Sequence, residues 1–179
     1  MRVISGSVRG RRLKTPENYD IRPTTDNVKE SLFNIIQFDI EGRRVLDLFA
    51  GTGQLGIECL SRGADSVVFI DQSREAVKII KENLKACGLS APVLQQEALS
   101  YLRSCGRFDL IFVDPPYDSQ LYESVLNVIN SVDILSDGGI IICETARDRQ
   151  LPVLQPPYRL AREYIYGKVK LSKYTKESL

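Results

Sequence analysis

The chain has 179 residues and a net charge of +1, with 43% hydrophobic and 26% charged residues, which is typical of one globular domain with its own core. Its apolar runs fall short of the roughly 20 residues of a membrane-spanning helix. The first residues turn polar too early for a signal peptide, so we expect no membrane partner. Histidine is absent and the four cysteines form no CxxC pair, which excludes imidazole sites and His-based triads and predicts no metal. Free thiols indicate a reducing, cytoplasmic environment.

Positive charge collects at both ends of the chain. The stretch from Arg159 to Lys176 carries six basic residues and one acid, Glu163. The first fourteen residues carry no acid and five basic residues, which are Arg2, Arg9, Arg11, Arg12 and Lys14. Such ends fit either a surface that binds a polyanion or ordinary solvated stretches, and charge alone leaves both interpretations open.

The chain between these ends alternates short apolar runs with amphipathic segments. After a short N-terminal arm or hairpin and a helix over 26–38, strands are predicted over 45–49, 66–70, 93–95, 108–113 and 140–143. Helices are predicted over 54–61, 74–86, 98–104 and 122–132, and two last strands over 158–166 and 168–174. Continuously apolar strands that alternate with helices predict parallel βαβ units.

This order predicts a single α/β domain with a Rossmann-like, mostly parallel seven-stranded sheet and an antiparallel C-terminal hairpin. We divide it into a basic N-terminal arm over 1–20, a helix over 21–40 and a catalytic core over 41–179. Ligands of such sheets bind beyond the carboxyl ends of the strands. The residues that directly follow each strand are therefore the candidates for a site.

A glycine-rich loop follows the first predicted strand. Gly51, Gly53 and Gly56 match G-x-G-x-x-G, and Asp71 lies 20 residues after Gly51, as in a dinucleotide-binding fingerprint. Asp47, however, places a carboxylate in front of this loop, where it repels a diphosphate and attracts an ammonium or sulfonium group. This favours S-adenosylmethionine over a nicotinamide or flavin cofactor. The alternative is that Asp47 caps a nearby helix.

Two more acidic residues follow the next strands. Asp71 stands where a carboxylate accepts both hydroxyls of a ribose, although it could instead cap the helix that starts near Ser73. The Glu97 carboxylate could accept from an adenine amine, and the Ala98 N–H could donate to a ring nitrogen. A surface glutamate that opens a helix is the alternative for Glu97.

The most informative motif is Asp114-Pro115-Pro116-Tyr117, after the fourth strand. Two prolines stop the strand and donate no N–H, so their carbonyls can face the cleft. A carboxylate and a carbonyl side by side accept both hydrogens of an exocyclic amine, and Tyr117 offers a flat face on which a base can stack. The motif predicts methylation of an amino group on an unstacked base.

These motifs resemble the amino-methylating class of S-adenosylmethionine-dependent methyltransferases. More narrowly, the whole chain resembles the RsmD family of small-subunit ribosomal RNA guanine-N2 methyltransferases. The matching stretches are residues 4–16, Arg22-Pro-Thr-Thr, Glu30-Ser-Leu-Phe-Asn34, 45–53, Gly56 and 113–117. The resemblance implies a class I methyltransferase fold and methylation of a guanine N2 in 16S ribosomal RNA.

The resemblance also implies roles for individual residues. Catalysis is expected at Asp114, Pro115, Pro116 and Tyr117. Cofactor contacts are expected at Arg22, Pro23, Thr24, Asp47, Phe49, Ala50, Gly51, Thr52, Gly53, Asp71, Gln72, Glu97, Ala98 and Asp114. The chain departs from the family at Asn27 and Lys29, where arginines are usual, and at Glu97, where aspartate is usual. Fewer forked cations on that helix predict a weaker grip on RNA.

The expected partner is ribosomal RNA, within the small subunit or an assembly intermediate. The arm cations Arg2, Arg9, Arg11, Arg12 and Lys14 are expected to bind phosphates while a guanine splayed from a loop passes Tyr117. Truncation of residues 1–14 is expected to impair RNA methylation and to leave cofactor binding intact.

Three other functions share parts of this pattern. A DNA adenine-N6 methyltransferase has the same logic at Asp114–Tyr117, but 179 residues leave little room for a separate DNA-reading element. A nicotinamide oxidoreductase is disfavoured by Asp47. An inactive RNA-binding module is disfavoured by the intact acidic and proline motifs.

Overall fold

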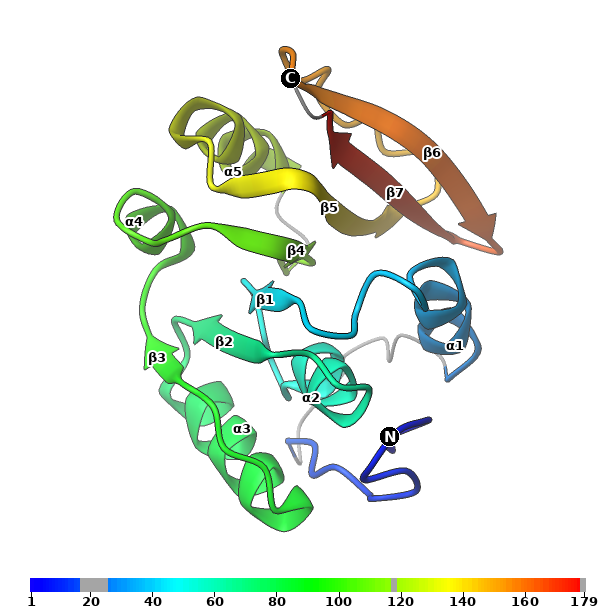
Figure 1. Cartoon of the computed structure of the whole chain (residues 1–179), viewed down its shortest axis with the longest axis vertical. Coiled ribbons are helices and arrows are strands. Elements are labelled where there is room, and N and C mark those ends of the chain that lie inside the picture. The colour runs from blue at the N-terminus through cyan, green and yellow to red at the C-terminus, as the bar shows by residue number, and fades with distance from the viewer. Residues whose placement is uncertain (17–25, 117–118, 178–179) are drawn as a thin grey trace.

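A computed structural model describes residues 1–16, 26–116 and 119–177, and its strands form one sheet in the order β3-β2-β1-β4-β5-β7-β6 (Figure 1). The strands of this described part are β1 (Arg44–Asp47), β2 (Ser66–Asp71), β3 (Val93–Gln95), β4 (Phe108–Val113), β5 (Leu135–Ala146), β6 (Tyr158–Tyr166) and β7 (Val169–Lys176). The strands β1 to β5 pair in parallel, and β7 pairs antiparallel with both β5 and β6. The mostly parallel sheet with an antiparallel C-terminal pair is thus confirmed. Its strand order reverses between β1 and β4, where a ligand crevice is expected.

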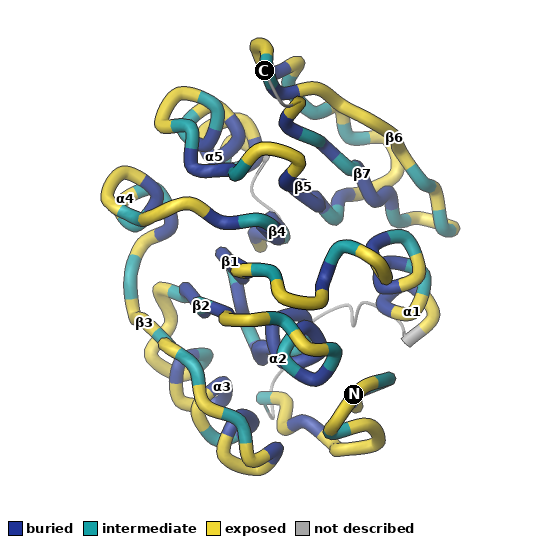
Figure 2. Tube along the Cα trace, in the orientation of Figure 1, coloured by how far each residue is buried: buried dark blue, intermediate teal, exposed yellow. Residues whose placement is uncertain are grey.

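Helices cover both faces of the sheet (Figure 1). The helices α1 (Asp26–Ile35), α2 (Gln54–Ser61) and α3 (Arg74–Cys87) contribute to the core on one face, and α4 (Ala98–Leu102) and α5 (Ser119–Val132) to the core on the other. Figure 2 shows that their sheet-facing sides are buried and their outer sides exposed. This two-sided cover explains why the central strands are continuously apolar.

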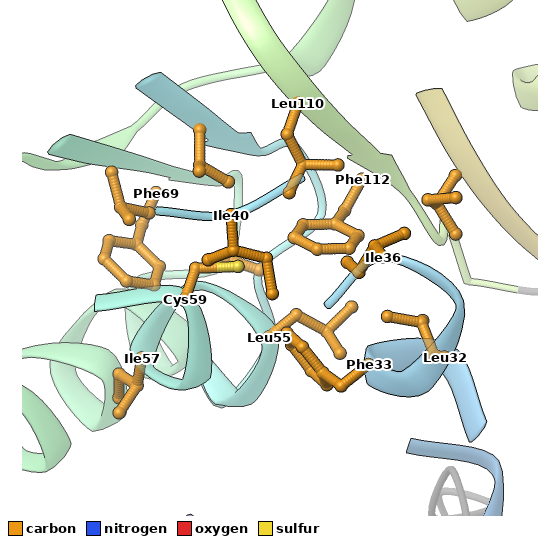
Figure 3. Packing of buried hydrophobic residues seen from close by; sticks show 14 of the residues in the cluster. Leu32, Phe33, Ile36, Ile40, Leu55, Ile57, Cys59, Phe69, Leu110 and Phe112 are labelled. Carbon is orange, nitrogen blue, oxygen red and sulfur yellow. The ribbon is translucent and has the colours of Figure 1, made fainter. Parts of the chain in front are cut away.

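The core under α1 and α2 shows how the first helix is attached (Figure 3). Leu32, Phe33 and Ile36 are almost completely buried, and the Phe33 ring lies 6.3 Å from that of Phe112 on β4. Burial of each such side chain stabilises the fold by about 1.5–3 kcal/mol. The apolar spacing that predicted a helix over 26–38 therefore marks its buried face, although the helix itself ends at Ile35.

The strand β5 is longer than the sequence predicts, 135–146 against 140–143. The sequence places the start of this strand after Gly138 and Gly139, but both glycines lie within β5. The pairing of β4 with β5 shifts register between Phe108 and Leu110, and Gly138 has a φ of 69°, as in a bulge. A glycine pair allows a bulge as readily as a turn, and the sequence does not distinguish them.

The first residues form a hairpin that packs against α2. Val3 donates its N–H to the Arg11 carbonyl oxygen at 2.9 Å, and Gly10 donates to that of Val3 at 2.9 Å. Gly6 lies so close to α2 that a Cβ atom there would stand 1.8 Å from the Ser61 carbonyl oxygen. Within the described residues, no helix is long and apolar enough to span a membrane.

Candidate active site

The candidate site is a cavity of about 500 Å³ at the carboxyl ends of the central strands. Twelve of the sequence-predicted residues line it, which are Asp47, Phe49, Ala50, Gly51, Thr52, Asp71, Gln72, Glu97, Ala98, Asp114, Pro115 and Pro116. Gly53 precedes α2 as its N-cap. The predicted residues Arg22, Pro23, Thr24 and Tyr117 lie outside the described residues. The structure therefore brings together residues that follow four different strands.

The glycine loop between β1 and α2 needs its glycines for two different reasons. Gly51 and Gly53 have φ values of 55° and 76°, which residues other than glycine rarely adopt. Gly56 instead allows α2 to approach the sheet, since a Cβ atom there would lie 2.3 Å from the Phe69 ring. The loop bends tightly enough for its backbone to face the cavity.

Asp47 is buried beneath this loop, where its carboxylate accepts the N–H of Gly56 at 3.0 Å. Removal from water raises the pKa of Asp47 to about 7, the Gly56 N–H opposes that shift, and the nearby charge of Asp71 adds to it. The helix-capping alternative is thus part of its role. Its position on the cavity wall also lets it accept from a cationic ligand.

Asp71 orders the loop from the end of β2. One carboxylate oxygen accepts the N–H of Gly51 at 2.9 Å, and the other accepts that of Ser73 at 2.8 Å. Each carboxylate oxygen can accept a second hydrogen bond. Asp71 therefore holds Ser73, the N-cap residue of α3, and can still accept ribose hydroxyls.

Glu97 has its carboxylate turned toward α4. Its two oxygens accept the N–H groups of Leu99 at 3.0 Å and Ser100 at 2.8 Å, so it is the N-cap of this helix. The structure thus gives the carboxylate a capping role, and its predicted contact with an adenine amine stays a prediction.

Asp114 directly follows β4 and faces the same cavity. Desolvation raises the pKa of Asp114 well above its usual value, and the neighbouring carboxylates of Glu144 and Asp47 raise it further. Pro115 is buried and Pro116 exposed, and their rings restrict the backbone directly after the carboxylate. The raised pKa makes the Asp114 carboxylate a stronger proton acceptor than an ordinary aspartate.

The cavity also has an unsatisfied polar atom. The Oε1 of Gln54, at the start of α2, is buried and has no hydrogen-bond partner among the described residues. A buried acceptor without a partner is costly. Gln54 and Asp47 line the same cavity, so acceptors for the ammonium group of S-adenosylmethionine are present there, and the residues fit this cofactor.

Beyond Asp114 the cavity continues along β5 and α5, a region that the sequence analysis did not mark. Glu144, Tyr122 and Arg149 line it. The Tyr122 hydroxyl donates to the Glu144 carbonyl oxygen at 2.6 Å, and the Arg149 guanidinium carbon lies 5.5 Å from the centre of the Tyr122 ring. The available signal was an acidic residue directly after the apolar run 140–143, as at Asp114.

The arm is attached to α2 through a buried carboxylate, Glu58. It accepts the N–H groups of Ile4 at 2.8 Å and Ser5 at 2.9 Å, and it pairs with Lys29 at 3.1 Å and Arg62 at 2.9 Å. Lys29 is completely buried, so it stabilises the fold and cannot contact RNA. The departure from arginine at Lys29 therefore cannot weaken a direct RNA contact, and the expectation of a weaker grip rests on the exposed Asn27 alone.

The two basic ends differ in structure. The arm cations Arg2, Arg9, Arg11, Arg12 and Lys14 are all exposed, and Lys14 pairs with Glu82 at 2.7 Å. Four of the six C-terminal cations form ion pairs, namely Arg159 with Glu177, Lys170 with Glu163, Lys173 with Asp39 and Lys176 with Asp133. The C-terminal stretch is thus largely neutralised, which leaves the arm as the more basic end. Within the described residues, no cluster of metal-binding side chains is found.

Comparisons with known proteins agree on one family. A family model described as "Conserved hypothetical protein 95" matches residues 1–175. The "Putative rRNA methyltransferase YlbH" of Bacillus subtilis is 41% identical, over 98% of this chain and 99% of its own. The "Ribosomal RNA small subunit methyltransferase D" of Escherichia coli K12 is 35% identical, over 99% of this chain and 91% of its own.

A solved structure is similar over the same length of the chain. The "Putative methyltransferase yhhF from Escherichia coli" superposes with a TM-score of 0.90 at 33% identity, covering 100% of this chain and 99% of the other. The similarity therefore extends over the arm, the site and the C-terminal strands together.

Proposed function

Since the chain belongs to the RsmD family of ribosomal RNA methyltransferases, we propose that it methylates the exocyclic N2 of a guanine in 16S RNA with S-adenosylmethionine. The observation that carries this proposal is the shared cavity of Asp47 and Asp114. It brings an anionic wall for a cationic cofactor next to an acceptor for an amine.

The cofactor half of the cavity is formed by the ends of β1 to β3. Asp47 and the Gln54 amide oxygen supply acceptors for an ammonium group, and Asp71 retains lone pairs for two ribose hydroxyls. When bound, S-adenosylmethionine supplies an electrophilic methyl carbon, whose bond to sulfur breaks as the bond to nitrogen forms. A nicotinamide dinucleotide would instead place its diphosphate beside the buried Asp47 carboxylate.

The acceptor chemistry is assigned to Asp114 and the prolines after it. A nucleobase amine is a poor nucleophile, because its lone pair is delocalised into the ring. The Asp114 carboxylate and the Pro115 carbonyl would accept its two hydrogens and direct the lone pair toward the methyl carbon. The raised pKa of Asp114 suits it to take the proton that the nitrogen releases.

The acceptor is proposed to be 16S RNA within a small subunit or its assembly intermediate, in the cytoplasm. The exposed arm cations would bind its phosphates. A DNA adenine-N6 methyltransferase is the alternative, because the same acceptors suit an adenine amine.

Labelled S-adenosylmethionine distinguishes these activities. The protein is incubated with small ribosomal subunits, free 16S RNA or duplex DNA, and the labelled nucleoside is identified after digestion. We expect N2-methylguanosine from RNA. N6-methyladenine from DNA would refute the assignment.

The variant Asp114→Ala tests the role of this residue as the acceptor for the amine. Loss of its acceptor should lower methyl transfer by roughly a hundredfold or more, as for other transition-state acceptors and donors. The affinity for S-adenosylmethionine, measured by calorimetry, should stay within a few-fold of wild type. Near-normal turnover would remove Asp114 from the mechanism.

A further inference from the structure

The half of the cavity beyond Asp114 is formed by residues that the proposed cofactor contacts leave unused. Glu144 ends the apolar part of β5, Tyr122 belongs to α5, and Arg149 follows β5. The inference below rests on the proposed function, because it assigns these residues to the base whose amine Asp114 holds.

The register of the sheet places Asp114 and Glu144 side by side. Val113 pairs with Cys143 in the parallel ladder of β4 and β5, and each acid follows directly after its paired residue. Both acids line the cavity, and their mutual repulsion is one reason why the pKa of Asp114 is raised. Two adjacent carboxylates are costly for a fold, but they provide a row of hydrogen-bond acceptors.

Arg149 lines the same cavity, three residues after β5 ends. Its backbone N–H donates to the Ala146 carbonyl oxygen at 3.1 Å, and its own carbonyl oxygen accepts from the Lys170 ammonium at 2.6 Å. Its guanidinium lies against the Tyr122 ring, and the Tyr122 hydroxyl is anchored on the Glu144 backbone. The backbone of Arg149 is thereby fixed, and the cavity is lined here by two carboxylates and a guanidinium.

We propose that Glu144 and Arg149 form the subsite that reads the Watson–Crick edge of the acceptor guanine. That edge presents the N2 amine, then the N1–H donor, then the O6 acceptor. With N2 at Asp114, N1–H meets the Glu144 carboxylate and O6 meets the Arg149 guanidinium. Charge-assisted hydrogen bonds of this kind are among the strongest that proteins form.

The same order of groups rejects adenine. With its N6 amine at Asp114, adenine would present the N1 lone pair to the Glu144 carboxylate, which is repulsive. A site built to accept a hydrogen bond discriminates strongly against a base that cannot donate it. The subsite therefore separates the guanine-N2 reaction from the adenine-N6 reaction that Asp114 alone would allow.

The test compares guanine with 2-aminopurine at the methylated position of the RNA. This analogue keeps the 2-amino group but has an unprotonated N1 and lacks O6. Wild-type protein should methylate it at least about a hundredfold more slowly than guanine. Equal rates would overturn the proposal, even if every variant below failed to fold.

Two variants then assign the preference. Glu144→Gln should lower the guanine-to-2-aminopurine rate ratio by about tenfold or more, because the new amide can donate to the bare N1. Arg149→Met should lower the methylation rate of guanine and leave the rate for 2-aminopurine unchanged. Arg147→Met, an exposed arginine outside the cavity, is the matched control and should keep the wild-type ratio.

Calorimetric titration with S-adenosylmethionine checks that each variant retains an intact cofactor site. If no N2-methylguanosine forms on RNA with wild-type protein, the proposed function fails. If it forms but both variants keep the wild-type ratio, the proposed function stands and the subsite is refuted.

Discussion

At the scale of single residues, the ionised carboxylate of Asp47 lowers the stability of the ligand-free fold, because it is buried. Its carboxyl is buried, and burial raises its pKa to about 7. A carboxyl with a raised folded-state pKa stabilises the fold while it is protonated, and this contribution is lost as pH rises through that pKa. A cationic ligand beside the ionised Asp47 would offset this loss of stability, which is consistent with the binding role proposed for Asp47.

The replacement Asp47→Asn tests this cost. Asparagine can still accept the Gly56 N–H, and it carries no charge. Between about pH 4 and pH 7, the unfolding free energy of the variant should therefore rise relative to wild type by roughly 2–4 kcal/mol, with affinity for S-adenosylmethionine reduced. Urea unfolding of both ligand-free proteins at a series of pH values measures the difference.

Asp109 gives a control of opposite sign. Burial raises the pKa of Asp109, but hydrogen bonds from Arg44 and Ser136 outweigh it and lower the pKa to about 2. It therefore stabilises the fold above about pH 4, so Asp109→Asn should lose stability relative to wild type as pH rises. If the difference in unfolding free energy between Asp47→Asn and wild type does not change with pH, the pKa of Asp47 is not raised in the folded protein.

At the scale of elements, the attachment of the arm to α2 depends on Glu58. Its carboxylate is fully buried between Lys29, Arg62 and the backbone N–H groups of Ile4 and Ser5. Replacement of one partner in a buried ion pair leaves the other charge uncompensated. The hairpin, α1 and α2 are thus joined at one charged centre.

Glu58→Gln should accordingly destabilise the protein by about 3–5 kcal/mol in urea unfolding, because Lys29 loses its buried counter-charge. The exposed pair of Lys14 and Glu82 has similar geometry, and Glu82→Gln should leave the unfolding free energy nearly unchanged. Equal effects of both changes would contradict a structural role for the buried centre.

Elements with strong local signals could be predicted from the sequence. Apolar runs and glycine turns located every strand of the described sheet and the acids at the carboxyl ends of β1, β2 and β4. Glu58 could not be recognised, because it lies on an ordinary amphipathic helix and two of its partners, Lys29 and the Ile4 N–H, are 29 and 54 residues away. Glu144 was missed although it directly follows the apolar run 140–143, because β5 continues to Ala146 and no proline or glycine directly after it marks a loop.

At the scale of the whole molecule, the arm is part of the fold and not a detachable tail. Its N–H groups satisfy Glu58, and Met1 and Pro16 line the candidate cavity. Truncation of residues 1–14 would expose that buried centre, so the expectation that it leaves cofactor binding intact is not supported by this packing. Point substitutions are the suitable test of the arm.

Two basic surfaces could bind the RNA backbone, the arm and the outer side of α3. On α3, Arg74, Lys78, Lys81 and Lys85 line a groove whose only acid, among the described residues, is Glu82. The arm remains the proposed site, because the hairpin adjoins the cavity through Met1. Two triple variants with equal loss of charge distinguish these surfaces.

Replacement of Arg9, Arg11 and Arg12 by glutamine should flatten the plot of log K for 16S RNA against log salt by about 2–3, since each lost phosphate contact removes roughly 0.7–0.9 from the slope. Replacement of Lys78, Lys81 and Lys85 by glutamine should leave the slope unchanged. The slopes come from binding titrations at several salt concentrations, with S-adenosylmethionine affinity confirming that both variants are folded. If only the α3 variant flattens the slope, the phosphates are bound by that helix, and the arm serves to complete the fold around Glu58.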